Sequence, residues 1–488
     1  AKNLETLVIL NTWSRMKLLR GSFYLWMVLG SGLLAVAEQP AQRLNVIVLL
    51  ADDMGWNGPA CYGSDLHRTP NLDHLAASGM KFTSAYAACT VCSPTRAAMM
   101  TGKYPARLHL TDWIPGQKRP WEILSIPDWN KRLELSETTI AEALKKVGYR
   151  TAHVGKWHLG SEGHMPENQG FDINVGGTLS GGPSGGYFLP NKMNLPEARP
   201  GEFLTDHLTT QALKIIDNWQ DEPFFLHFAY YTVHTPIQGK PELVKQYQPR
   251  IRPDGIHTNA TYAAMFQSLD ESVGRIVKKL NDLKIADRTV ILFTSDNGGL
   301  TQRLGKKTNI TNNAPLRRGK GAAYEGGVRV PMIVHWPGVT KAGSSCDTPV
   351  MTIDYFPTIM QITAANSESN SQNKVDGKSF VPLLQGKPGF SRDAIFWHYP
   401  HYHAGGDHPY GAIRSGNWKL IEFYNDQPIE LYDLDADIGE AKNLATLKPE
   451  MAQRLHGQLQ TWRGSVAAQM PTPNPRYDPR KALLPARP

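Results

Sequence analysis

The sequence predicts an α/β fold: a mostly parallel central sheet flanked by helices, followed by a small C-terminal α+β subdomain. Unbroken apolar runs at residues 46–50 and 290–293 are typical of strands that are covered on both faces. Each run is followed by polar side chains, which are Asp52 and Asp53 for the first and Asp296 and Asn297 for the second. Helix signals alternate with further strand-like segments between the runs, and this alternation favours a parallel sheet with its ligands beyond the carboxyl ends of the strands.

Local signals support the individual elements. Thr69 and Pro70 predict the start of a helix that Gly79 ends, and Thr139 with Glu142 forms a capping box for a helix that ends at Gly148. Segments 149–160 and 223–236 have the pattern of strands that run into polar residues. Segments 410–424 and 429–434 predict short antiparallel strands, and Pro449 begins an amphipathic helix.

The changes of pattern along the chain predict four parts. They are an upstream extension with a signal peptide (1–37), an N-terminal α/β domain (38–390), a C-terminal subdomain of antiparallel sheet and helix (391–470) and a proline-rich tail (471–488). The tail is too rich in proline for regular structure, so we expect it to lie extended over the surface.

The N-terminal region has the pattern of a secretory signal. Lys17 and Arg20 precede an apolar stretch at 23–34, and Ala35 to Ala37 form a small-x-small cleavage site. The apolar stretch is shorter than the roughly 20 residues that span a membrane. We therefore expect export to the periplasm or the extracellular space, with no membrane attachment after cleavage. Because the chain has only 4 cysteines, disulfides do not dominate its stability.

Charge excludes one class of partner. The formal net charge is +8, but no Lys/Arg block of the kind that grips nucleic acid is present. We expect no nucleic-acid partner, and the mild basicity is compatible with an anionic ligand.

Cys89 and Cys92 leave three alternatives open: a zinc clip, a redox pair or a single nucleophile. A zinc site needs a second pair of ligands, which neither Cys61 nor Cys346 supplies. A thioredoxin-like pair belongs to a smaller domain and usually reacts through its first cysteine. Pro94 predicts the first turn of a helix, which would place Cys92 at the positive helix end.

The run Cys92-Ser93-Pro94-Thr95-Arg96, followed by Thr101-Gly102, resembles the signature of the type I, formylglycine-dependent sulfatases, an arylsulfatase-like group in the alkaline phosphatase superfamily. Other segments resemble motifs of this family and occur in its order, from about residue 44 to 435: LLADDMGW, TGKYP, GKWHLG, HTP, TSDNGG, GKGAAYEGGVRVP, WKLIEFY and ELYDL. The resemblance implies an alkaline phosphatase-like fold, a catalytic domain at 38–390 and the activity of a sulfuric ester hydrolase.

The resemblance also implies the cofactors. A maturation enzyme would convert Cys92 to formylglycine, whose hydrated aldehyde is the family's nucleophile. The family's divalent metal site corresponds to Asp52, Asp53, Cys92, Asp296 and Asn297. Carboxylate and amide oxygens suit Ca²⁺, with Mg²⁺ as the alternative, and no soft ligand favours zinc.

Further catalytic roles follow from the same resemblance. Arg96 and Lys156 would steady the nucleophile, Lys156 and Lys320 would hold the sulfate, His158 would help to release it and His234 would protonate the leaving alcohol. Arg96 lies one helical turn after Cys92, and Lys156 and His158 share a face if their segment is extended. Lys103 is a weaker prediction, since it could only buttress the site.

The substrate is less readable. We expect a sulfated carbohydrate or an aryl sulfate, with pocket candidates at Asp112, His398, His401, His403 and Arg414. Two alternatives remain: a phosphonate or phosphate ester hydrolase of the same superfamily, and a glycan-binding protein with a dead site. The hydrolase alternative would cut a phosphorus ester instead of a sulfate ester, and the glycan-binding protein would cut no ester.

Overall fold

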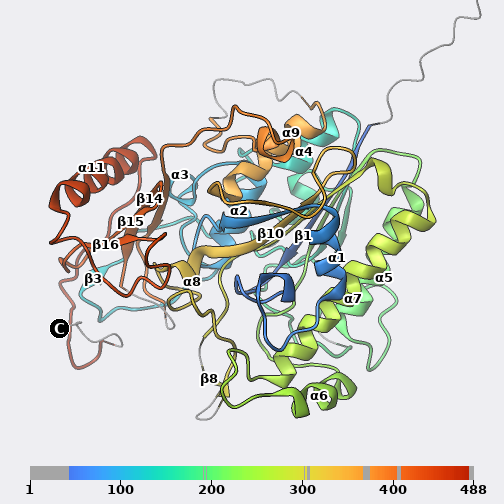
Figure 1. The fold of residues 1–488 in the computed structure, drawn as a ribbon, viewed down its shortest axis with the longest axis horizontal. Coiled ribbons are helices and arrows are strands. Elements are labelled where there is room, and N and C mark those ends of the chain that lie inside the picture. The colour runs from blue at the N-terminus through green and yellow to red at the C-terminus, as the bar shows by residue number, and fades with distance from the viewer. Residues whose placement is uncertain are drawn as a thin grey trace, which may run out of the picture. The chain divides into compact units, whose positions relative to one another are not determined.

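The computed structural model describes residues 43–190, 192–193, 195–301, 303–304, 308–365, 374–403 and 408–482 (Figure 1). The predicted signal peptide lies outside these residues. Within them, no helix combines the length and the apolar character needed to cross a membrane.

A nine-stranded sheet forms the centre of the molecule. Its strands are β1 (Asn45–Ala51), β2 (Met80–Tyr86), β4 (Arg150–Gly155), β5 (Ile173–Val175), β6 (Phe224–Ala229), β7 (Thr289–Ser295), β10 (Arg329–His335), β11 (Ser344–Cys346) and β12 (Val350–Met351). Eight follow the order β11-β2-β10-β7-β1-β6-β4-β5, and β12 pairs with β2. Only β10 runs antiparallel to its neighbours in this sheet, which confirms the predicted mostly parallel arrangement.

Helices cover both faces of the sheet (Figure 1). Alternate residues of β1 divide between two cores: Ile47 and Leu49 pack with α1 (Pro70–Ser78), α5 (Leu204–Asn218) and α7 (Ala260–Asp282). Val46 and Val48 pack with the opposite group, which comprises α2 (Cys92–Thr101), α4 (Ile140–Lys146), α9 (Tyr355–Ile362) and α10 (Val381–Leu384). The central strands are therefore buried on both faces, as their unbroken apolar runs indicate.

Short elements complete this domain. The remaining helices are α3 (Pro105–Leu108), α6 (Pro241–Tyr247) and α8 (Glu325–Val328), and β8 (Arg303–Leu304) forms a hairpin with β9 (Thr308–Asn309). The predicted capping box of α4 is present, since Glu142 N donates to Thr139 Oγ1 and Thr139 N donates to Glu142.

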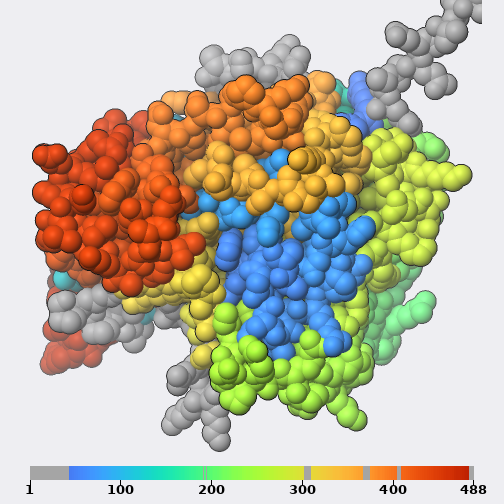
Figure 2. Space-filling model, viewed as in Figure 1, coloured from blue at the N-terminus to red at the C-terminus, as the bar shows by residue number. Residues whose placement is uncertain are grey.

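The C-terminal part contains a separate four-stranded antiparallel sheet, β13 (Ile395–Tyr399), β14 (Tyr410–Ser415), β15 (Trp418–Phe423) and β16 (Glu430–Asp433). Helix α11 (Pro449–Ser465) packs on it through Leu455 and Leu459. Figure 2 shows these C-terminal residues, in red, gathered at one end of the visible face. This architecture confirms the predicted α+β subdomain; the boundaries at residues 37, 390 and 470 stay predictions.

The proline-rich tail forms one short strand, which the sequence did not predict. β17 (Thr472–Pro473) pairs antiparallel with β3 (Leu124–Ser125). Asn474 then donates from Nδ2 to the carbonyl oxygens of Pro120 and Glu122, at 3.0 and 2.7 Å. The tail is thereby fastened to the segment 120–125.

Candidate active site

The site lies beyond the carboxyl ends of four adjacent strands. β1 and β7 pair in parallel with Ala51 opposite Ser295, so the polar pairs that follow them emerge at the same sheet edge. β4 and β6 pair alongside with Gly155 opposite Ala229, and they lead to Lys156 and His234. The strand register thus brings together the polar residues that the sequence places after each strand.

Cys92 is the first residue of α2, so its side chain lies at the positive end of that helix. It is 2% exposed and lines the largest cavity described below. Cys89 is buried, and burial raises the pKa of its thiol. Neither cysteine is in a disulfide. Of the described residues, the one cluster of potential metal-ligating acidic, histidine or cysteine side chains contains no cysteine, so the zinc-clip alternative has no support.

Three buried cations tie the acidic groups together. Arg96 donates from Nε and Nη2 to Asp296 Oδ2 at 2.9 and 2.7 Å, and from Nη1 to the carbonyl oxygen of Lys156. Lys156 Nζ donates to Asp52 Oδ2 at 2.7 Å, and Lys320 Nζ donates to Asp53 Oδ1 at 2.7 Å. Each carboxylate therefore has a cation on one side.

Three oxygens of this cluster lack a hydrogen bond, although Arg96 lies 3.7 Å from Asp52 Oδ1. Asp52 Oδ1, Asp53 Oδ2 and Asn297 Oδ1 are buried and have no hydrogen-bond partner. Asp52 and Asp53 also form the described cluster that could hold a metal ion, together with His234. Buried oxygens without partners are costly unless something else satisfies them, and hard oxygens suit Ca²⁺ or Mg²⁺. The residues present fit a divalent cation.

The predicted ligand set fits unevenly. Both oxygens of Asp296 already have partners, because Oδ1 accepts from Asp53 N and Oδ2 accepts from Arg96. His234, which the sequence places among the catalytic residues, lies with Nε2 at 3.7 Å from Asp53 Oδ2. The structure therefore adds His234 to the groups that could hold a metal ion.

The pKa values of the three buried carboxyl groups shift in different directions. Burial raises the pKa of Asp52 well above its usual range, against the pull of Lys156. Burial acts the same way on Asp53, but Lys320 and His234 outweigh it and hold its pKa below the usual range. The pKa of Asp296 is also lowered, because Arg96 and Lys156 overcome the effect of burial.

The two predicted catalytic histidines differ in exposure: His158 is buried, whereas the side chain of His234 is 18% exposed. His158 donates from Nε2 to the carbonyl oxygen of Ile114 at 2.5 Å, which leaves Nδ1 as an acceptor without a partner. His234 donates from Nδ1 to the carbonyl oxygen of Thr235 at 2.8 Å, so its Nε2 faces the carboxylates. Burial lowers the pKa of His158 well below its usual value and that of His234 to about 3.

A cavity of about 630 Å³ opens over these groups. It is lined by Cys92, Trp113, Ile114, Pro115, Gln117, His158, Leu179, Ser180, Gly181, Gly182, His234, Thr235, Leu300, Lys320 and His403. Four predicted catalytic residues border this cavity, namely Cys92, His158, His234 and Lys320. Arg96 and Lys156 are fully buried and are not among its lining residues.

Of the predicted substrate-pocket residues, His403 lines the cavity and the others do not. Asp112 accepts from Tyr399 Oη and from Trp113 N, and His401 contacts Thr111. His398 contacts Tyr424, and Arg414 contacts Tyr86. These four side chains serve internal contacts. Lys103 pairs with Glu137 and is not among the cavity's lining residues, so its buttressing role stays a prediction.

The sequence analysis missed Trp113, Gln117 and the loop 179–182. The glycine-rich run 181–186 was a visible signal for that loop, because Gly181 and Gly182 approach His158 and His234 so closely that a Cβ would lie 2.6 and 3.3 Å from their rings. No comparable signal marked Gln117.

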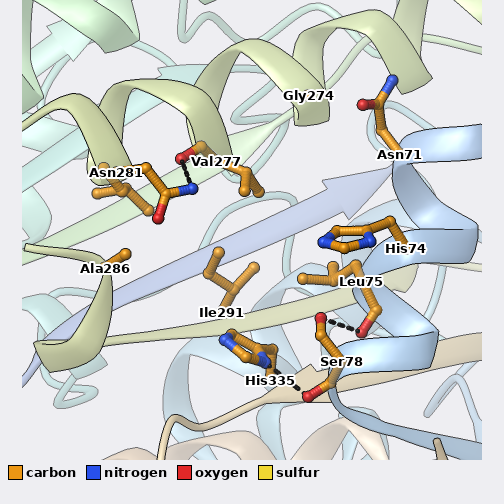
Figure 3. Close-up of a pocket in the computed structure, with 11 residues that line it drawn as sticks. Asn71, His74, Leu75, Ser78, Gly274, Val277, Asn281, Ala286, Ile291 and His335 are labelled. Carbon is orange, nitrogen blue, oxygen red and sulfur yellow. Dashed lines mark hydrogen bonds between the residues drawn. The ribbon is translucent and has the colours of Figure 1, made fainter. Parts of the chain in front are cut away.

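A second cavity, of about 230 Å³, lies between α1, α7, β7 and the end of β10 (Figure 3). Asn71, His74, Ser78, Asn281 and His335 are its polar lining residues. None of the predicted site residues borders it, so it does not compete with the first cavity as the active site.

The fold and the site define a class of protein: a hydrolase in which a residue at a helix N-terminus and a lysine line one cavity, beside a cluster of buried acidic groups that could hold a metal ion. The sulfatase family model matches residues 44–365, and the model of the C-terminal region of N-sulphoglucosamine sulphohydrolase matches 319–464. The chain therefore belongs to the sulfatase family, and its enzyme class is sulfuric ester hydrolase, as the sequence predicted.

Individual relatives agree with this assignment. A sulfatase of Formosa agariphila is 31% identical, over 86% of this chain and 89% of the relative. Human arylsulfatase A is 32% identical, over 91% of both chains. A solved structure, Ps i-CgsB in complex with k-i-k-neocarrahexaose, has a TM-score of 0.73 at 30% identity and covers 89% of this chain and 95% of its own.

Proposed function

We propose that this protein is an exported sulfatase that removes sulfate from a carbohydrate, through formylglycine formed from Cys92 and a divalent cation held by Asp52, Asp53 and Asn297. The observation that carries the proposal is that Cys92, His234 and Lys320 line one cavity, while Lys320 also pairs with Asp53, one of three residues with a buried oxygen that lacks a hydrogen-bond partner. The saccharide in the complex of the similar Ps i-CgsB structure supports a carbohydrate substrate.

Two groups that the structure does not hold supply the chemistry. The divalent cation would polarise the reacting oxygens, and the hydrated aldehyde of formylglycine would supply the nucleophilic hydroxyl. The position of residue 92 at the start of α2 suits a developing anion, because the helix N-terminus is positive.

The chain's own cations bind and orient. Lys320 borders the cavity and is proposed to hold the sulfate, with Lys156 behind it. Arg96 is proposed to steady residue 92 from one helical turn away, while its fork to Asp296 fixes its direction. Because these groups are buried, their attraction to a sulfate is stronger than it would be in water.

The histidines are proposed to move protons. His158 offers an unpartnered Nδ1 lone pair at the cavity, which suits a group that takes a proton as sulfate is released. His234 faces the carboxylates with Nε2 and is proposed to protonate the leaving alcohol. Its lowered pKa in the free protein requires the anionic substrate to favour its charged form.

Two further expectations belong to the proposal. The signal-like segment 16–37 would direct export, and a formylglycine-generating maturation enzyme would act on Cys92. Because every residue from Cys92 to Arg96 is buried in the fold, that enzyme needs the segment exposed.

The test uses protein produced with a formylglycine-generating enzyme. Mass spectrometry should find residue 92 oxidised, and the protein should hydrolyse 4-nitrophenyl sulfate faster than 4-nitrophenyl phosphate. Cys92→Ala should abolish turnover, whereas Cys89→Ala, a matched control, should retain it. An intact thiol at residue 92 in active enzyme contradicts the mechanism. Faster phosphate turnover favours the phosphoesterase alternative, and no turnover of any ester favours the dead glycan-binding protein.

A further inference from the structure

The loop 113–119 forms one wall of the active-site cavity, and Gln117 is its polar residue there. The other lining residues of this loop, Trp113, Ile114 and Pro115, are apolar or aromatic. Gln117 is half-buried, and its carboxamide carries one acceptor oxygen and a two-proton donor group. Which end faces the cavity therefore decides what the wall can recognise.

Arg119 determines that orientation. It donates to Gln117 Oε1 from Nε at 3.0 Å and from Nη2 at 2.8 Å. A guanidinium has only donors, so the carboxamide must turn its oxygen to Arg119 and its amino group away. Among the described residues, Gln117 Nε2 has no hydrogen-bond partner. The wall therefore carries one oriented donor that the protein leaves unused.

Arg119 is itself held in place. Its side chain is 8% exposed, and its Nη1 lies 3.5 Å from Glu122 Oε1, which is 3% exposed. The backbone at Glu122 is fastened by Asn474 of the tail, and Tyr402 Oη accepts from Leu124 N at 3.0 Å. These contacts hold the loop and give the Gln117 amino group a fixed position. A donor in a fixed position is suited to recognising a ligand group.

The charges around the cavity indicate what Gln117 binds. Lys320 is the one lysine or arginine among the described lining residues, and burial with the nearby Lys320 charge lowers the pKa of His403 to about 4. The described lining of the cavity thus offers one lysine, enough for one sulfate. Arg119 is paired with Glu122, so the Gln117 wall contributes a neutral donor rather than a second anion site.

We infer that Gln117 is a specificity-determining residue whose Nε2 donates to an uncharged oxygen, a hydroxyl or ring oxygen, of a sugar whose single sulfate is held at Lys320, and that Arg119 positions it. This inference rests on the proposed sulfatase function and adds the substrate's chemistry: a sugar unit with one sulfate in the cavity.

The experiment compares two kinds of ester with the matured enzyme. One is 4-nitrophenyl sulfate, whose ring has no hydroxyl. The other is whichever is cleaved fastest among galactose 6-sulfate, N-acetylgalactosamine 6-sulfate, N-acetylglucosamine 6-sulfate and k-i-k-neocarrahexaose. The variants are Gln117→Met, Arg119→Met and the double variant, with Lys118→Met on the same loop as the matched control.

Gln117→Met should lower kcat/KM for the sugar about three- to tenfold, the effect of one lost hydrogen bond, and leave the aryl ester within about twofold. Arg119→Met should act in the same direction, and the double variant should be no worse than Gln117→Met, because Arg119 acts through Gln117. Lys118→Met should change neither substrate. This selectivity separates positioning from a general loss of structure, which would lower both activities.

Equal losses on both esters, or losses of the two single variants that add, would overturn the inference. Turnover of the aryl ester with no sugar in the panel cleaved would also overturn it while leaving the sulfatase function standing. Failure of the wild-type matured protein on every sulfate ester would overturn the proposed function itself.

Discussion

Two buried groups of charges in this molecule differ in how their oxygens are satisfied. The seam cluster consists of Glu325, Arg329, Lys419 and Glu440 and lies where the C-terminal sheet meets the main domain. Glu325 Oε1 contacts Lys419 Nζ at 2.9 Å, and its Oε2 accepts from Tyr86 Oη at 2.7 Å. Glu440 accepts from Glu325 N at 2.7 Å with one oxygen and contacts Lys419 Nζ at 2.9 Å with the other.

The site cluster consists of Asp52, Asp53, Asp296, Asn297, Arg96, Lys156 and Lys320. It is buried as deeply as the seam cluster, and three of its oxygens have no hydrogen-bond partner. Arg96 lies 3.7 Å from Asp52 Oδ1 and His234 lies 3.7 Å from Asp53 Oδ2. In the seam cluster Glu440 Oε1 also lacks a hydrogen bond, but Lys419 Nζ is only 2.9 Å away. The seam cluster therefore satisfies its oxygens more closely with the chain's own cations than the site cluster does. Since unpaired buried oxygens cost free energy, the site cluster is the one that calls for an outside cation and an outside anion.

The largest expected effect is on activity, from Asp53→Asn in the site cluster. Losing one carboxylate at the metal position should lower kcat/KM by about 10³-fold or more, equivalent to about 4 kcal/mol. The free energy of unfolding in EDTA should fall by less than this, because loss of the ion pair with Lys320 is partly offset by relief of repulsion with Asp52 and Asp296. Enzyme kinetics measures kcat/KM, and urea unfolding of the same preparation measures the free energy of unfolding. If Asp53→Asn lost activity only because it unfolds, the site cluster would be structural like the seam cluster.

The next effect is on stability, from Lys419→Met in the seam cluster. Removing Lys419 leaves buried Glu440 without its cation and Glu325 with Arg329 alone, which should cost about 3–5 kcal/mol of unfolding free energy. The specific activity of the folded fraction should stay near wild type, because Lys419 does not border the cavity. If Lys419→Met instead lost activity while its free energy of unfolding stayed unchanged, the seam cluster would serve catalysis rather than stability.

Binding of Ca²⁺ should depend on the site cluster and not on the seam cluster. Ca²⁺ at about 100 times its Kd should stabilise the folded protein by about 2.7 kcal/mol, raising Tm by a few degrees over the EDTA sample. Asp53→Asn should reduce this shift strongly, whereas Lys419→Met should keep it on a lower baseline. Differential scanning calorimetry measures it, and an equal shift in wild type and Asp53→Asn would place the cation elsewhere.

The smallest effect concerns pH and Glu440. Burial, partly opposed by Lys419, raises the pKa of Glu440 to about 7 in the folded protein. The folded state therefore holds this proton up to a higher pH than the unfolded state, and the associated stability is lost as pH rises towards 7. Glu440→Gln lacks this titration, so its stability relative to wild type should increase from pH 5 to pH 8. Glu450→Gln, an exposed control, should show no such trend in urea unfolding.

The parts of the fold that depend on local pattern were predictable. The apolar runs of β1 and β7 indicated buried parallel strands, and their register explains why the polar pairs after them converge. The capping box at Thr139 and the helix that begins at Cys92 were also readable, because their signals lie within a few residues.

What depends on distant contacts was not predictable. The sequence placed Lys156 and His158 on one extended face, but β4 ends at Gly155 and His158 adopts a left-handed backbone with φ of 59°. The polar residues of β13 and β14 were expected near the substrate, but their sheet directs His398 and Arg414 to internal partners. Gln117 acquires its orientation only from the Arg119 fork, which no local pattern reveals.

Because β17 pairs with β3, the segment that follows the cavity-wall loop is held by residues that are synthesised after the main domain. A ribosome finishes the central sheet, α2 and the strand-end carboxylates long before residues 472–474 emerge. The segment 120–125, which follows the loop that carries Gln117, therefore gains its contacts with residues 472–474 only after those elements have been made. A chain truncated before residue 472 would keep its catalytic residues. It would lack the contacts that hold the segment 120–125, so we expect it to lose part of its substrate selectivity.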